Sequence, residues 1–180
     1  LETYVQHDII TSPKELEEYL HSYISVLPYN ELGAAAAAYN ADENELCRLD
    51  EIYSAVKTPF EIRSGSEKVT RRFFKICNNG QESFTGLYKN LTEQGICKGH
   101  QCIAYALYMR DNGIELSEGL AVYGYSICSA IVTNCVKLVP LSQLAGQKIL
   151  GESFELISSA SEKALFTDIN DIGISGAGFD

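Results

Sequence analysis

The segment Cys97-Lys98-Gly99-His100-Gln101-Cys102 places two thiols and one imidazole within six residues, and chemistry is most plausible there. Thiolates and imidazoles are soft ligands that suit late first-row metals. A structural zinc site usually combines one Cys-x-x-Cys pair with a second such pair, but the spacing here differs and no second pair follows. Metal binding is one interpretation, and a histidine at a helix start beside packed cysteines is the favoured one.

A cysteine followed by a helix is also the arrangement of a papain-like nucleophile. That chemistry requires a histidine base and usually a third group that orients the base. The three histidines are His7, His21 and His100, so no candidate base lies downstream of the cluster. The sequence therefore disfavours a thiol hydrolase.

The glycine-rich tail from Gly173 to Gly178 resembles a phosphate-binding loop at first sight. It has no preceding strand, no following helix and no Lys-Ser/Thr pair, all of which a phosphate loop needs. We interpret the tail as a flexible terminus.

Composition limits the classes of function. The 180 residues are 46% hydrophobic, which is enough for one compact domain, and the net charge of −10 disfavours nucleic-acid binding. The apolar stretch from Leu120 to Val136 is interrupted by polar residues and Gly124, so a buried core helix is favoured over a membrane span. Six irregularly spaced cysteines and no secretory signal in the given sequence indicate reduced thiols and a cytoplasmic location.

The elements that must position these residues are predicted to be helices. Ser12 followed by Pro13, and Asp42 followed by Glu45, are typical helix starts, and no segment alternates with period two. We predict an all-α fold, an irregular bundle of about nine or ten helices. The predicted helices extend over about 13–27, the alanine run 34–38, 43–56, 59–77, 83–93, 99–112, 117–137, 140–158 and 161–169. In the helix 59–77, the apolar residues Phe60, Val69, Phe73 and Ile76 are predicted to lie on the inner side.

Four groups of segments resemble the UreF family of urease accessory proteins. The most specific is Asn134 to Leu150, which combines a basic residue with Pro-Leu-x-Gln and Gly-Gln-x-hydrophobic-Leu. The other groups are Leu1 to Gln6 with the helix that starts at Ser12-Pro13, Thr58 to Arg63 with Arg71-Arg72-Phe73, and Gly99-His100 with Tyr105-Ala106 and Asn112 to Leu116. Together they extend over most of the chain in the order of the family.

The resemblance implies one UreF-like helical domain over residues 1–180, with the family's N- and C-terminal segments lying outside this sequence. It implies an adaptor, usually a homodimer, that binds UreD (also called UreH) and recruits the GTPase UreG to deliver nickel to the urease apoprotein. No catalytic residue and no cofactor of its own are expected, because the complex handles nickel and the partner binds GTP. Nucleic acid and membranes are not expected partners.

Eight residues are predicted to bind partners. Glu61 and Arg72 are eleven positions apart on one predicted helix and so share a face, whereas Arg63 points elsewhere. For these three residues an internal tie, such as a pair between Arg63 and a carboxylate of another helix, is the favoured alternative to a partner contact. Lys137, Gln143 and Gln147 surround the predicted helix junction at Pro140, and His100 and Tyr105 belong to a segment that resembles the family. The full set is Glu61, Arg63, Arg72, His100, Tyr105, Lys137, Gln143 and Gln147.

Overall fold

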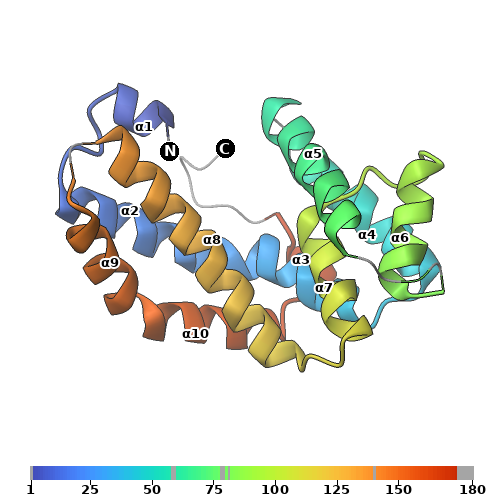
Figure 1. Cartoon of the computed structure of the whole chain (residues 1–180). Coiled ribbons are helices and arrows are strands. Elements are labelled where there is room, and N and C mark those ends of the chain that lie inside the picture. The colour runs from blue at the N-terminus through green and yellow to red at the C-terminus, as the bar shows by residue number, and fades with distance from the viewer. Residues whose placement is uncertain (1, 58–59, 78–79, 81, 140, 174–180) are drawn as a thin grey trace.

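The computed structural model describes residues 2–57, 60–77, 80, 82–139 and 141–173. Over these residues the chain forms ten α-helices and two short 3-10 helices, without a strand, which confirms the predicted all-α class (Figure 1). The elements are α1 (Glu2–Gln6), α2 (Pro13–Val26), η1 (Leu27–Tyr29), α3 (Glu31–Tyr39), α4 (Glu43–Val56), α5 (Phe60–Ile76), α6 (Phe84–Glu93), α7 (Gln101–Asp111), α8 (Leu116–Leu138), α9 (Gln143–Glu152), α10 (Phe154–Ala164) and η2 (Ile169–Asp171).

Local capping explains several helix starts. The Ser12 hydroxyl accepts a hydrogen bond from the Glu15 amide, and Pro13 occupies the first position of α2. At α4 the Asp42 carboxylate accepts from the Glu45 amide at 2.9 Å, and the Glu45 carboxylate accepts from the Asp42 amide at 2.9 Å. This reciprocal pair satisfies two amides that have no partner inside the helix.

Three predicted boundaries were wrong. Helix α9 begins at Gln143, where the Ser142 hydroxyl accepts from the Ala145 amide at 3.1 Å, and not at position 140. Helix α8 begins at Leu116 because the Glu115 carboxylate, rather than Ser117, caps it by accepting from the Glu118 amide at 3.2 Å. The predicted helix from 140 to 158 is divided at Ser153, whose hydroxyl donates to the Ile149 carbonyl at 2.8 Å. Such a bond back to the preceding turn bends helices.

The separate helix predicted at 161–169 was also incorrect. Helix α10 already contains Ser161 and ends at Ala164, and only the short η2 follows it. Pro140, residues 58–59 and the tail after Gly173 lie outside the described residues.

Helix α3 occupies the centre of the packing. It contacts α4, α7, α8 and α10 (Figure 1), and the side chains of Ala34, Ala35 and Ala38 are fully buried. Small side chains let neighbouring helix backbones approach closely. The closest approach is at Gly33, where an added Cβ would lie 2.1 Å from the Pro28 carbonyl oxygen of η1.

Among the described residues, α8 is the one helix with the length and apolar composition of a membrane span. Its buried side includes Leu120, Tyr123, Cys128 and Val132, and it packs against α2, α3, α7, α9 and α10. These contacts agree with the predicted core helix.

A buried carboxylate joins α4, α6 and the loop before α7. Asp50 is 2% exposed and accepts hydrogen bonds from the Tyr88 hydroxyl at 2.5 Å, the Lys98 amide at 2.7 Å and the Gly99 amide at 3.0 Å. The Tyr88 oxygen in turn accepts from the His100 amide at 2.8 Å. One side chain thus fixes three segments that are distant in sequence.

We predict that Asp50→Asn lowers the free energy of unfolding by roughly 2 to 4 kcal/mol, because an amide group cannot accept all three hydrogen bonds and leaves a buried donor unpaired. Urea unfolding followed by circular dichroism measures the change. The control Glu51→Gln changes an exposed carboxylate of the same helix and should have no measurable effect. Equal stability of the two variants would contradict the role given to Asp50.

Candidate functional site

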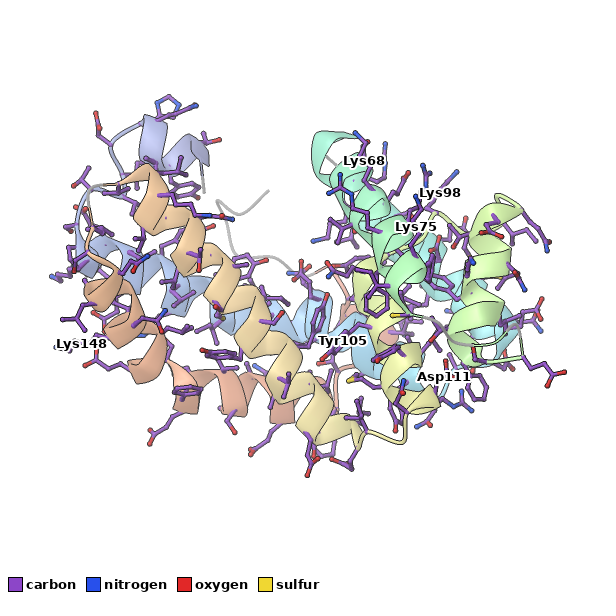
Figure 2. The ribbon with its side chains drawn as sticks, viewed as in Figure 1. Lys68, Lys75, Lys98, Tyr105, Asp111 and Lys148 are labelled. Carbon is purple, nitrogen blue, oxygen red and sulfur yellow. The ribbon has the colours of Figure 1, made fainter. Side chains whose placement is uncertain are left out.

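A polar pocket of about 380 Å³ opens between α4, α5 and the loop that follows α6. Lys98, at its edge, lies beside α5 (Figure 2). Three of its lining side chains are cationic and one is acidic, so the pocket favours an anion over a cation. The lining residues are Ser54, Arg63, Glu67, Arg71, Thr92, Gly95, Cys97 and Lys98.

The charges of this pocket are partly balanced inside it. Arg71 pairs with Glu67 one turn away at 3.6 Å, and Arg63 is half-buried. Arg63 and Arg72 are nine residues apart, which is half a turn out of phase, so Arg72 is exposed on the other side of α5. The predicted separation of the two arginines is therefore consistent with the structure, while the Glu61 side chain lies outside the described parts.

His100 stands at the N-cap position of α7 without a capping hydrogen bond from its side chain, and it contacts Ser54 of the pocket lining. Its side chain is fully buried, its Nε2 is 2.7 Å from the Ser54 hydroxyl, and its ring meets Tyr53 edge to face at 5.0 Å. The Nδ1 atom is buried without a hydrogen-bond partner among the described residues. The imidazole cannot touch a partner directly in this conformation, and any effect of His100 on binding must act through the loop that it anchors.

The two thiols of the sequence cluster are also internal. Cys97 Sγ lies 3.8 Å from Cys47 Sγ, and burial, with a smaller contribution from Asp50, raises the pKa of Cys97 well above its usual value. Burial raises the pKa of Cys102 to about 12. Both sulfurs are therefore protonated at neutral pH, which disfavours a thiolate nucleophile or ligand. Within the described ranges, no three His, Cys, Asp or Glu side chains gather as a metal site would require.

Tyr105 is half-buried in an aromatic stack. Its ring lies 4.6 Å from that of Tyr123 on α8, and Phe73 of α5 packs at 6.4 Å (Figure 2). The residue joins α5, α7 and α8, so packing accounts for most of its surface.

The other predicted residues gather at the corner between α8 and α9. Lys137 is exposed in the last turn of α8, while Gln143 and Gln147 are exposed one turn apart at the start of α9. Leu138 and Leu144 are 47% and 80% exposed beside them. We call these five residues the α8–α9 corner.

The structure also contains an apolar groove that sequence reasoning missed. Val122 and Tyr125 of α8 and Phe154 and Ile157 of α10 line a groove of about 550 Å³. Phe154 is 55% exposed, and its ring stacks on that of Tyr125 at 5.3 Å. Apolar residues are spaced evenly along α8, so the sequence did not indicate that the side with Val122 and Tyr125 would stay exposed to solvent.

We predict that acid weakens the fold through His100. Burial lowers the pKa of His100, with Lys57 and Arg63 contributing in the same direction and Asp50 and Glu67 opposing them. The unfolded imidazole, with a pKa near about 6.5, then binds a proton more readily than the folded one. Stability from this group is therefore present above about pH 6.5 and lost as the pH falls, by at most about 1.4 kcal/mol per pH unit.

Urea unfolding at about pH 7.5, 6.5 and 5.5 tests this dependence, since the slope should be shallower for His100→Gln than for the unmodified chain. His7 is exposed at the end of α1, so His7→Gln should keep the original slope. An unchanged slope in the His100 variant would contradict the prediction.

Comparison with known proteins places these features in a family. The model of the UreF family matches residues 10–153, which include α2 to α9. Proteins named urease accessory protein UreF are similar over nearly the whole chain. The protein of Haemophilus influenzae Rd is 32% identical, and the alignment covers 93% of this chain and 74% of that protein. The protein of Actinobacillus pleuropneumoniae serotype 5b is 31% identical, with 96% of this chain and 79% of that protein covered. The protein of Streptococcus thermophilus LMD-9 is 25% identical, with 100% of this chain and 78% of that protein covered.

The match extends over both the Asp50 network and the α8–α9 corner, and the all-helical architecture agrees with the expectation from sequence. The chain belongs to the UreF family of urease accessory proteins.

Proposed function

We propose that this protein is a non-catalytic adaptor in nickel insertion, which binds UreD (UreH) and the GTPase UreG and brings them to the urease apoprotein. The observation that carries this proposal is the family match over residues 10–153. An accessory protein that acts by positioning others needs exposed surfaces more than it needs a reactive site.

The distribution of exposed residues supports an adaptor. The α8–α9 corner combines exposed polar side chains with Leu138 and Leu144, a mixture that is typical of protein interfaces. A second exposed surface lies on α5, which is well separated from α9 in the view of Figure 1. Two separate surfaces allow two partners to bind at the same time.

The buried chemistry supports a role without catalysis. His100 and both neighbouring cysteines are inside the fold, and the thiols are protonated. A nucleophile must be accessible and activated by a base, and neither condition is met in this cluster. Nickel is then cargo of the assembly, and GTP chemistry belongs to the partner.

We further propose a cytoplasmic homodimer that binds neither nucleic acid nor membranes. All six cysteines are free thiols, as expected in a reducing compartment. The groove between α8 and α10 exposes Val122 and Phe154, and apolar surface of this kind is a candidate contact between two copies. The net charge of −10 opposes binding to phosphate-rich surfaces.

The α8–α9 corner generates a prediction about activation. Replacing Lys137, Gln143 and Gln147 together by alanine should lower urease activation in a reconstituted assay about tenfold, which corresponds to about 1.4 kcal/mol of lost partner binding. The circular dichroism spectrum and unfolding midpoint should stay unchanged, since all three side chains are exposed.

A matched control replaces three exposed polar residues elsewhere, Asn44, Gln94 and Lys163, by alanine and should activate normally. Unchanged activation by the corner variant would remove the corner from the proposed adaptor surface.

A second prediction concerns the absence of resident ligands. Isothermal titration of the full-length protein with nickel and with GTP should give no heat of specific binding, while apo-urease should activate only when this protein, UreD and UreG are all present. Submicromolar one-to-one nickel binding that disappears in His100→Ala would instead favour a metallochaperone, because a filled site must use the only imidazole near two thiols.

A further inference from the structure

Helix α5 differs in charge from the rest of the chain. Its 17 residues hold five of the 14 basic side chains and only two acidic ones, whereas the whole chain carries a net charge of −10. The cations are Arg63, Lys68, Arg71, Arg72 and Lys75. Because the remaining surface is acidic, this helix is a local positive region that can attract an anionic partner.

One side of α5 is fixed against the bundle. Thr70 is fully buried, Phe74 meets Tyr88 edge to face at 6.0 Å, and Phe73 meets Tyr108 at 5.6 Å. These contacts set the rotation of the helix about its axis. The opposite side must therefore face outwards.

The outward side combines cations with aliphatic residues. Lys68, Arg72 and Lys75 follow at intervals of four and three, and Val69 and Ile76 lie one position after Lys68 and Lys75, so all five share a face about 120° wide. Val69 is 42% exposed and Ile76 is 80% exposed, contrary to the inward orientation that their spacing had indicated. We call this set the α5 outer face.

Among the residues that the structure describes, the cations of the α5 outer face have no counter-charge in an ion pair. Lys68, Arg72 and Lys75 form no ion pair with any residue that the structure describes, whereas Arg71 pairs with Glu67 on the pocket side. Figure 2 shows Lys68 and Lys75 on α5, with Lys98 on the neighbouring loop. Carboxylates of a partner can thus pair with these groups without breaking an ion pair between described residues.

We propose that the α5 outer face docks an acidic surface of a partner protein, one whose carboxylates lie beside a small apolar patch that covers Val69 and Ile76. Residues 68 to 76 extend over about 12 Å of helix, which suits a compact protein contact. Val69 and Ile76 lie along one edge of this face with Arg72 beside them, and apolar residues next to an arginine are typical of the part of an interface that contributes most affinity.

The same features disfavour other anionic partners. A helix that lies on a membrane needs a broad apolar face, often with aromatic residues, whereas this face offers two aliphatic side chains. A duplex or bilayer also extends far beyond 12 Å and would meet the acidic remainder of the chain. A protein can confine its charge to the area of contact.

This inference deepens the proposed adaptor role and rests on it, since the docked protein is one of the two accessory partners. The test is the affinity of the full-length protein for UreD and for UreG, measured separately at low and high salt. Lys68→Glu/Arg72→Glu/Lys75→Glu should weaken one of the two complexes at least about tenfold at low salt and less at high salt. Ile76→Ser should weaken the same complex at both salt concentrations.

The control Lys14→Glu/Arg48→Glu/Lys89→Glu changes two lysines and one arginine at exposed positions on α2, α4 and α6, with the same change in net charge. It should bind both partners as the unmodified protein does. If the α5 variants also bind both partners normally, the inference is wrong and the adaptor role stands. If the unmodified protein binds neither partner, the adaptor role fails and the inference fails with it.

Binding of the unmodified protein to duplex DNA or to phosphatidylserine vesicles, lost in the charge-reversal variant, would also overturn the inference in favour of those surfaces. The α5 variants should keep the unfolding midpoint, because the substituted side chains are exposed. The control breaks the exposed pairs Lys14–Glu18 and Lys89–Glu93, which contribute little to stability, so its midpoint should shift only slightly. Ile76→Ser leaves the charge unchanged and so tests the apolar part of the surface independently.

Discussion

The buried carboxylate of Asp50 is the interaction on which the candidate site depends. A charge that is removed from water is tolerated only when hydrogen bonds replace its hydration, and Asp50 receives three from Tyr88, Lys98 and Gly99. Two of them come from the consecutive amides of Lys98 and Gly99 in the loop before α7. The carboxylate therefore determines where α7 begins, where Lys98 reaches the surface and how deep His100 lies. The hydrogen bonds that stabilise the buried Asp50 carboxylate also hold the loop before α7 in one conformation.

The Asp50 network and the aromatic contacts of α5 together fix the rotation of α5 about its axis. Tyr88 accepts from the His100 amide and also packs against Phe74, so the same ring links the loop to α5. A helix held by Phe74 on one side presents Lys68, Arg72 and Lys75 on the other. Rigid placement matters for binding, because side chains that are already positioned lose less conformational entropy when a partner arrives. The Asp50 network therefore also helps to fix the orientation of the α5 outer face.

Much of the fold could be predicted from sequence because its signals are local. Ser12 and Asp42 cap helices through bonds to residues three positions away, and the structure has both. The errors arose where alternatives were equally local: Glu115 rather than Ser117 caps α8, and the hydroxyl of Ser153 bends a helix that propensity alone would continue. The inward orientation assigned to Ile76 failed because periodicity identifies an apolar stripe without showing whether the fold covers it.

The site was less predictable, and its geometry explains why. The cluster from Cys97 to Cys102 looked reactive because residue types alone do not reveal burial, and burial converts the imidazole and both thiols into neutral packing groups. Conversely, Asp50 and Tyr88 lie 38 positions apart and no motif connects them. Long-range hydrogen bonds of this kind produce no periodic pattern in the sequence. The concentration of cations in α5, by contrast, can be read directly from the sequence. A binding surface on a helix is therefore easier to recognise from its charges than from motifs of reactive residues. Binding depends on the side chains exposed along one helix face, whereas catalysis needs side chains that converge on one point.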